Sequence, residues 1–217
     1  HRGVADLKKR TVRIIGNPET RYREDPVRML RAVRFAAKLN ATIDPATLAP
    51  IKPMAQLISN VPSSRLFDEV IKLLTCGHAI DCLKQLETLG LHQHLLPFID
   101  TLFNNPDHFR FLELALDRTD ARVRTGKTIS PGFLFAALLW KLVNNQWDIN
   151  QKEGLPRVQA LVEAADTVIN NQASNLAIQR RFQADMREIW FMQPRFERAT
   201  PRTIWRLLEH PRLRAAV

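Results

Sequence analysis

The sequence lacks the features of a membrane or secreted protein. Its longest apolar stretch, residues 133–140, is far shorter than the roughly 18 uncharged residues of a membrane span and indicates a core helix. No signal-peptide pattern opens the chain. The only two cysteines, Cys76 and Cys82, lack C-x-x-C spacing. We therefore expect a cytoplasmic protein in which both cysteines are buried or half-buried free thiols.

Several motifs of catalysis and cofactor binding are also missing. The chain contains no Walker-type or dinucleotide-binding glycine motif. His92 and His94 flank Gln93 but have no third ligand at metal spacing, so we expect a structural or surface role for both. Aromatic residues are few, and the four tryptophans leave two options open, because they can stack RNA bases or fill a core. Trp140 lies in the apolar run and favours the core.

The 217 residues have an ordinary globular composition, with 45% hydrophobic and 25% charged residues. The net charge of +10 is unevenly distributed: residues 1–40 carry +7, residues 41–178 carry −2 and residues 179–217 carry +5. Basic ends around a near-neutral middle favour a binding surface for a polyanion such as RNA. The alternative is that these residues only coat solvated helix faces.

The patterning predicts a mainly α-helical fold with one short strand. Residues 7–16 end in β-branched residues and a Gly-Asn-Pro turn, which indicates a strand. We find no convincing second strand, and a lone strand needs partners. We therefore expect it to belong to a sheet whose other strands precede His1.

Helices are expected through the rest of the chain. Asp25 suits an N-cap and Pro26 a first helical position, and an apolar stripe that includes Phe35 follows until Asn40. Residues 119–130 are the best candidate for an exposed connector. Further helices are expected from Pro45 and at residues 63–74, 79–89, 109–116, 133–143, 158–168, 178–191 and 203–208.

Asp25 and Arg28 form the sharpest local constellation. Three residues apart, they are neighbours on the first turn of a helix. A carboxylate that only accepts and a guanidinium that only donates together offer a two-point hydrogen-bonding edge. Adenine and cytosine each present an amino donor beside a ring-nitrogen acceptor, whereas guanine and uracil present an N–H there. The pair can thus accept A or C and reject G and U. Alternatively, Asp25 only caps the helix while Arg28 is solvated or pairs with Glu24.

Residues 14–36 resemble the signature of class II RNA nucleotidyltransferases, the tRNA CCA-adding enzymes and bacterial poly(A) polymerases. The E-D-x-x-R element of that family selects the nucleobase, and it matches Glu24, Asp25 and Arg28. The resemblance implies that Asp25 and Arg28 contact the base edge and that Glu24 supports them. Arg31, Arg34 and Lys38 follow on successive turns and are candidates for RNA phosphate contacts.

A second match lies in residues 64–74. Arg65, Glu69 and Lys72 are similar to the family's R-x-x-x-E-x-x-K helix and lie on one helical face. As a bare pattern this is an ordinary exposed ion-pair ladder. In the family the segment braces the base-selecting helix, which implies a positioning role for Arg65 and Glu69.

The resemblance also implies what the chain lacks. The family holds two divalent metals, Mg²⁺, with a D-x-D after a Gly-Ser turn, and neither pattern occurs here. We therefore expect no catalytic or metal-binding residue in this chain and no activity from it alone. The resemblance implies three parts: residues 1–20, the end of a palm or head domain; residues 21–105, a helical neck that binds nucleobase and RNA; and residues 106–217, a helical body that binds RNA.

The stretches 131–140 and 205–216 resemble the poly(A) polymerase branch. The leading hypothesis is therefore a monomeric part of an RNA adenylyltransferase that uses ATP and RNA 3′ ends. CCA addition to tRNA is the alternative within the family. A non-catalytic helical RNA-binding module is the alternative from another class.

Overall fold

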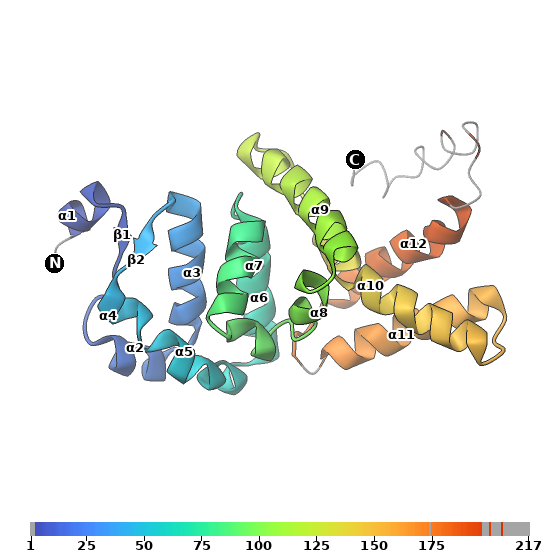
Figure 1. Ribbon diagram of the computed structural model, residues 1–217, viewed down its shortest axis with the longest axis horizontal. Coiled ribbons are helices and arrows are strands. Elements are labelled where there is room, and N and C mark those ends of the chain that lie inside the picture. The colour runs from blue at the N-terminus through green and yellow to red at the C-terminus, as the bar shows by residue number, and fades with distance from the viewer. Residues whose placement is uncertain (1–2, 174, 197–199, 201–204, 206–217) are drawn as a thin grey trace. The chain divides into compact units, whose positions relative to one another are not determined.

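The computed structural model describes residues 3–173, 175–196, 200 and 205, and this part of the chain is mainly helical, as the sequence predicts (Figure 1). The chain divides into two compact units, His1–Lys127 and Thr128–Val217. Within the described ranges, no helix is both long and apolar enough to cross a membrane. Of the helix predicted at 203–208, all but Trp205 lies outside the described residues.

Two short parallel strands pair in the first unit. After helix α1 (Gly3–Lys8), strand β1 (Thr11–Val12) lies beside β2 (Thr42–Ile43), with Thr11 opposite Thr42 and Val12 opposite Ile43. The sequence predicts the first strand, but the expectation that no second strand exists in the chain is wrong. A strand of two residues is too short to show an alternating pattern, so the sequence pattern does not predict β2.

Helix α2 (Pro18–Glu24) was not predicted. The side chain of its N-cap, Asn17, accepts the backbone N–H of Thr20 at 3.0 Å, and Pro18 fills the first position. With seven residues, of which only Tyr22 is buried, it shows no apolar stripe. The Tyr22 hydroxyl donates to the backbone carbonyl of Thr47 at 2.9 Å, and burial raises its pKa to about 12.

Helix α3 (Val27–Leu39) carries most of the candidate residues. Its N-cap is Pro26, so the prediction of Asp25 as N-cap is corrected: Asp25 is the C-cap of α2. Its carboxylate still accepts the backbone N–H of Val27 at 3.3 Å, which explains the cap-like sequence pattern. Asn40 ends α3 in the left-handed region, with φ of 45°, as predicted.

The core of the first unit forms where α3 packs against α6 and α7. Leucine, valine and phenylalanine side chains of α6 lie on one face and are buried. The remaining short elements connect this core. The elements between β2 and the last helix of this unit are α4 (Pro45–Leu48), α5 (Ile51–Met54), the 3₁₀ helix η1 (Ala55–Asn60), α6 (Ser63–Leu74), α7 (Ala79–Thr88), the 3₁₀ helix η2 (Leu91–His94) and α8 (Ile99–Phe103).

Helix α9 (Pro106–Arg124) shortens the expected connector at residues 119–130, because residues 119–124 are helical and only residues 125–130 link α9 to α10. Thr119 and Asp120 belong to the helix and are buried. The Asp120 carboxylate accepts the backbone N–H of Ala79 at 2.8 Å, which satisfies the N-terminus of α7. A polar pair was mistaken for a loop because a long-range capping contact leaves no local pattern.

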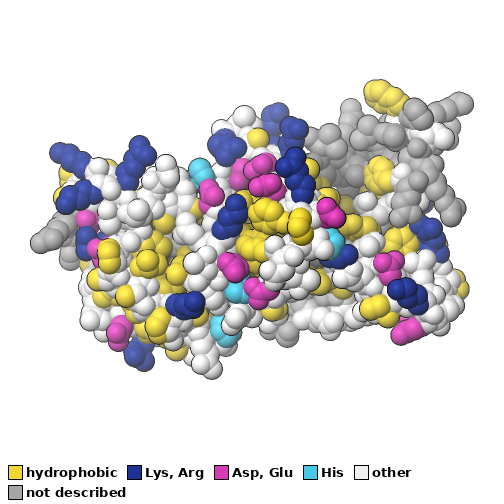
Figure 2. All heavy atoms as spheres, viewed as in Figure 1, with side chains coloured by type: hydrophobic (Ala, Val, Ile, Leu, Met, Phe, Trp, Pro, Cys, Tyr) yellow, Lys and Arg dark blue, Asp and Glu magenta, His cyan; other side chains and the backbone are white. Residues whose placement is uncertain are grey.

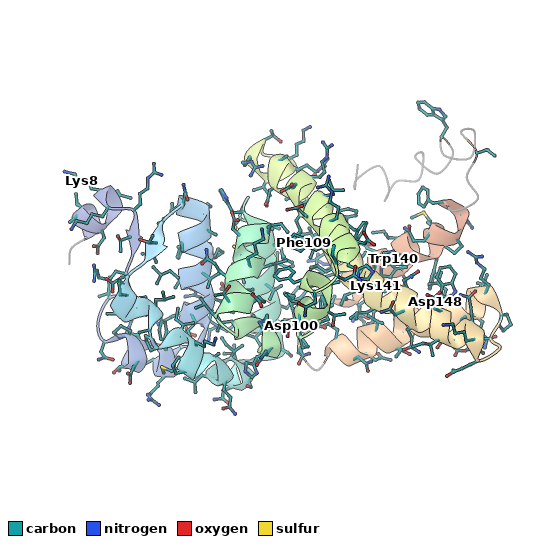
Figure 3. The ribbon with its side chains drawn as sticks, in the orientation of Figure 1. Lys8, Asp100, Phe109, Trp140, Lys141 and Asp148 are labelled. Carbon is teal, nitrogen blue, oxygen red and sulfur yellow. The ribbon has the colours of Figure 1, made fainter. Side chains whose placement is uncertain are left out.

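The described residues of the second unit form three long helices, α10 (Pro131–Lys152), α11 (Arg157–Ala173) and α12 (Arg180–Phe196), and α10 packs against both others. Trp147 and Trp190 are buried and donate to the backbone carbonyls of Arg157 and Ala136. Trp140, expected in the core, is half-buried on α10 (Figure 3).

Gly132 sets the separation between α10 and α12. A Cβ built at this position would lie 2.5 Å from the Asp185 Cβ. We predict that Gly132→Ala lowers the free energy of unfolding by about 1–3 kcal/mol, because the two backbones must move apart. Urea denaturation followed by circular dichroism measures this.

The matched control is Gly3→Ala, where an added Cβ meets nothing within 4 Å. Equal unfolding free energies for the two variants would show that the close approach of α10 and α12 is not required.

Candidate functional site

Asp25 lies at the junction of α2 and α3, and its carboxylate is held from two sides. Oδ2 accepts a hydrogen bond from Arg65 Nη2 at 2.8 Å, and Oδ1 accepts the Val27 backbone N–H. Among the described residues, its salt-bridge partner is therefore Arg65 on α6 and not Arg28. The alternative pairing of Arg28 with Glu24 is also not seen, because Glu24 pairs with Arg21.

Arg28 lines a cavity of about 420 Å³ between α3 and the β1 segment. Its Nε atom is buried and has no hydrogen-bond partner within the described part of the chain. Arg21 and Arg31 line the same cavity, and the Nε atom of Arg21 is likewise buried without a partner. Guanidinium donors gathered around one hollow favour an anionic or acceptor-rich ligand.

Arg13, Arg21 and Phe35 were not among the predicted site residues, yet all line this cavity. Phe35 was expected to face inward, but it is 41% exposed. A signal was available, because positions 28, 31 and 35 repeat at helical spacing and share one face. An exposed aromatic ring beside guanidinium groups is suited to stacking on a planar base.

Helix α6 braces both halves of this region. The predicted ladder along α6 is corrected in one respect, because Arg65 turns to Asp25 and does not pair with Glu69. The Glu69 side chain is 3% exposed and pairs with Lys72 at 2.8 Å and with Arg31 at 3.4 Å. Arg65 and Glu69 thus fix Asp25 and Arg31, an arrangement suited to the expected positioning role.

The three candidates for phosphate contacts share one face of α3. Arg31 is tied to Glu69 and remains 40% exposed. The guanidinium of Arg34 lies 4.4 Å from the ring centroid of Phe35, and Lys38 is exposed in the last turn. Figure 2 shows further Lys and Arg side chains over the α1 segment and over the C-terminal end of α9.

The β1 segment carries one more cation, Arg13, whose charge is locally balanced. It pairs with Asp6 at 3.1 Å and with Asp44 at 2.6 Å. The hydrogen bond to Asp6 raises the pKa of Arg13, and the Asp44 charge acts in the same direction. Arg13 therefore contributes less net charge to the cavity than Arg28 does.

The predicted histidines have structural surroundings. His92 is buried with Nδ1 3.3 Å from the Leu86 carbonyl, and its Nε2 lies 2.9 Å from Asp100 on α8 (Figure 3). His94 lies 3.3 Å from the Ser59 hydroxyl. In the described ranges no group of three or more His, Cys, Asp or Glu side chains is placed to hold a metal ion.

Two family models match the chain. Residues 40–103 match the probable RNA and SrmB-binding site of polymerase A, and residues 153–217 match the polymerase A arginine-rich C-terminus. Poly(A) polymerase I of Salmonella typhi is 44% identical over 99% of the chain, and that of Haemophilus influenzae is 40% identical over 98%. The chain belongs to the poly(A) polymerase family. It spans about half the length of these relatives, 47% and 48% respectively.

Two further matches are weaker. A CCA-adding enzyme of Levilactobacillus brevis is 45% identical, but over only 45% of the chain. A solved structure described as a tRNA-processing enzyme with CTP superposes with a TM-score of 0.62 and 17% identity, covering 99% of this chain and 55% of the other. That likeness shows a shared fold.

We predict that Glu69→Gln lowers the free energy of unfolding by about 1–3 kcal/mol, because charge-assisted hydrogen bonds to Arg31 and Lys72 are weakened at a buried position. Chemical denaturation of the chain measures the change. Asp68→Asn, on the exposed side of the same helix, is the matched control and should stay within about 0.5 kcal/mol of the parent. Indistinguishable effects at the two positions would mean that Glu69 does not brace α3.

Proposed function

We propose that this chain supplies base selection and RNA binding to a template-independent RNA adenylyltransferase, which adds AMP from ATP to RNA 3′ ends. The observation that carries the proposal is the identity of 40–44% to Poly(A) polymerase I along nearly the whole chain. The arginine-lined cavity beside Asp25 supplies the physical basis. RNA processing by polyadenylation is the activity that follows from it.

Base selection rests on Asp25 and Arg28, with Glu24 in support. Arg65 fixes the Asp25 carboxylate in one orientation, and each carboxylate oxygen keeps a lone pair after its single bond. The Arg28 side chain faces the cavity, where it has donors to offer. An incoming adenine would receive hydrogen bonds from Arg28 at N1 and donate its amino group to Asp25. Phe35 is the natural stacking partner at the rim of the same cavity.

The RNA strand is proposed to follow the basic face of α3. Arg34 and Lys38 extend that face away from the cavity, and Arg31 stands between them and Arg28. Glu69 neutralises part of the Arg31 charge, so Arg34 and Lys38 supply most of the free attraction for phosphates. Arg65 and Glu69 act as positioning residues in this proposal.

The metal chemistry is proposed to come from outside this chain. Two Mg²⁺ ions would activate the RNA 3′-hydroxyl and steady the leaving pyrophosphate. The described residues do not fit that role, since among them no group of three or more His, Cys, Asp or Glu side chains could hold a metal ion. The residues of this chain bind and orient ATP and RNA.

We propose residues 1–20 as the end of a palm or head domain, 21–105 as the neck and 106–217 as the body, with the compact units dividing later, after Lys127. We also propose that the protein acts as a monomer in the cytoplasm, where ATP and RNA 3′ ends are both available. Sedimentation of the purified chain tests the monomer.

We predict that Arg28→Ala reduces the preference for ATP over GTP by about tenfold or more, because the acceptor at N1 loses its donor. The measurement is single-nucleotide extension of an RNA primer by a protein that joins this chain to the catalytic domain of such a polymerase. Metal-dependent addition should remain detectable.

The matched control for this measurement is Arg23→Ala on α2, an exposed arginine that does not line the cavity. Unchanged discrimination by the Arg28 variant would remove Arg28 from base selection. Equal losses in both variants would point to a general charge effect.

RNA binding by this chain is predicted to weaken steeply with salt, because phosphate contacts release counterions. Replacing Arg34 by Gln should lower the slope of log K against log salt by about one. Fluorescence anisotropy with a labelled oligoadenylate measures the slope. Lys152→Gln, on α10, is the comparison, and a slope that Arg34→Gln leaves unaltered would argue against the α3 face.

CCA addition to tRNA remains the second candidate, supported by the matches to CCA-adding enzymes over part of the chain. Extension products separate the two functions. Unlimited addition of A to a generic RNA supports polyadenylation, whereas termination after C, C and A on tRNA would overturn it.

A further inference from the structure

The only two cysteines of the chain meet in the core of the first unit. Cys76 lies in the turn between α6 and α7, and Cys82 lies in the second turn of α7. Their sulfur atoms are 3.5 Å apart, and both are free thiols. Because a disulfide bond is about 2.05 Å long, a closure of about 1.5 Å separates the pair from a bond.

The two thiols differ in reactivity. The hydrogen bond between the two sulfurs lowers the pKa of Cys76 to about 7, and a backbone hydrogen bond from His78 adds to this effect while burial opposes it. The same contact and complete burial raise the pKa of Cys82. Cys76 is 8% exposed and Cys82 is 0% exposed. Cys76 is thus the better nucleophile and the one that a small oxidant reaches first.

The charged groups around the pair come from three elements. Arg34 of α3 favours the Cys76 thiolate, whereas Asp120 of α9 opposes it. Asp81 of α7 disfavours ionisation of Cys82. The turn itself is held by Arg124, whose Nη1 donates to the Gly77 carbonyl at 2.8 Å.

We propose that Cys76 and Cys82 form a reversible oxidative modification site, in which Cys76 is the attacking thiol and Cys82 resolves it. The oxidant is a hydroperoxide. The Cys76 thiolate attacks the terminal peroxide oxygen, the O–O bond breaks, and the other oxygen leaves as an alcohol or water after taking a proton from solvent. Cys76 becomes a sulfenic acid.

The second step closes the disulfide. The Cys82 sulfur attacks the Cys76 sulfur, the S–O bond breaks, and the departing hydroxide takes the Cys82 proton and leaves as water. The two sulfurs lose two electrons in total, which the peroxide gains. A dithiol returns the pair to its reduced form by thiol–disulfide exchange.

The turn between the two cysteines contains Gly77, whose φ of 87° is a left-handed conformation that suits glycine. Closing the sulfur pair requires this turn, and its hydrogen bond to Arg124, to adjust. The cysteine pair lies at the C-terminal end of α6. This helix braces Asp25 and Arg31 through Arg65 and Glu69. Oxidation would tie the end of that helix to α7.

The test treats the folded chain with hydrogen peroxide, blocks free thiols by alkylation and digests it with trypsin. Cleavage after Lys72 and Lys84 leaves both cysteines in one peptide, residues 73–84. The expected product is that peptide lighter by two hydrogen atoms and without alkyl groups, with both thiols restored by dithiothreitol.

Two variants fix the order of attack. In Cys82→Ser, peroxide should leave a sulfenic acid at Cys76 that dimedone labels, and in Cys76→Ser the remaining thiol should lose almost all of this reactivity. In the parent chain, the rate of disulfide formation should rise between pH 6 and 8, as a group with a pKa of about 7 loses its proton.

Other outcomes overturn the proposal. Two alkylatable thiols after peroxide treatment of the folded chain would mean that the pair is only core packing. A disulfide that forms only in urea, or only between two chains, would show that the native geometry does not support the step. Dimedone labelling of Cys82 in place of Cys76 would contradict the assigned roles.

Discussion

The candidate site depends on the ion pairs of the Glu69 carboxylate, which is almost completely buried between Arg31 and Lys72. A buried carboxylate is stable only when its charge is balanced and its lone pairs are satisfied. Glu69 therefore needs Arg31, and Arg31 in return is drawn against α6. One turn earlier on α6, Arg65 does the same for Asp25. The two ion pairs tie α3 and the α2–α3 junction to α6.

Ion pairs also reduce the repulsion among the arginines of the cavity. Arg13, Arg21, Arg28 and Arg31 all line one cavity, where their like charges repel one another. Three of them have acidic partners: Asp6 and Asp44 for Arg13, Glu24 for Arg21, and Glu69 for Arg31. Among the described residues Arg28 has no such ion-pair partner. The cavity thus concentrates its unbalanced positive charge on the residue that the sequence motif singles out.

Sequence reasoning succeeded where local patterns decide the structure. The α3 stripe, its end at Asn40, and α6 follow from apolar periodicity and turn chemistry, whereas the base-selecting role of the E-D-x-x-R element stays a prediction. Prediction failed where distant contacts matter: β2 is defined by its pairing with β1, and Asp120 lies buried in α9 with its carboxylate bonded to the start of α7. The inward orientation expected for Phe35 was wrong for a related reason. An apolar residue at the edge of a stripe faces outward when the neighbouring segment leaves a cavity instead of a packing surface.

The parallel pairing of β1 with β2 joins the two ends of the segment that contains α2 and α3. The chain leaves the strand pair after Val12, runs through α2 and α3, and returns beside its starting point at Thr42. Backbone hydrogen bonds from Thr42 to Arg10 and from Asp44 to Val12 close that circuit. Helix α3, which carries Arg28 and begins just after Asp25, therefore leads into β2 at its C-terminal end and is linked to β1 through α2 at its start. A displacement of the C-terminal end of α3 would therefore strain the two backbone hydrogen bonds that hold β2 beside β1.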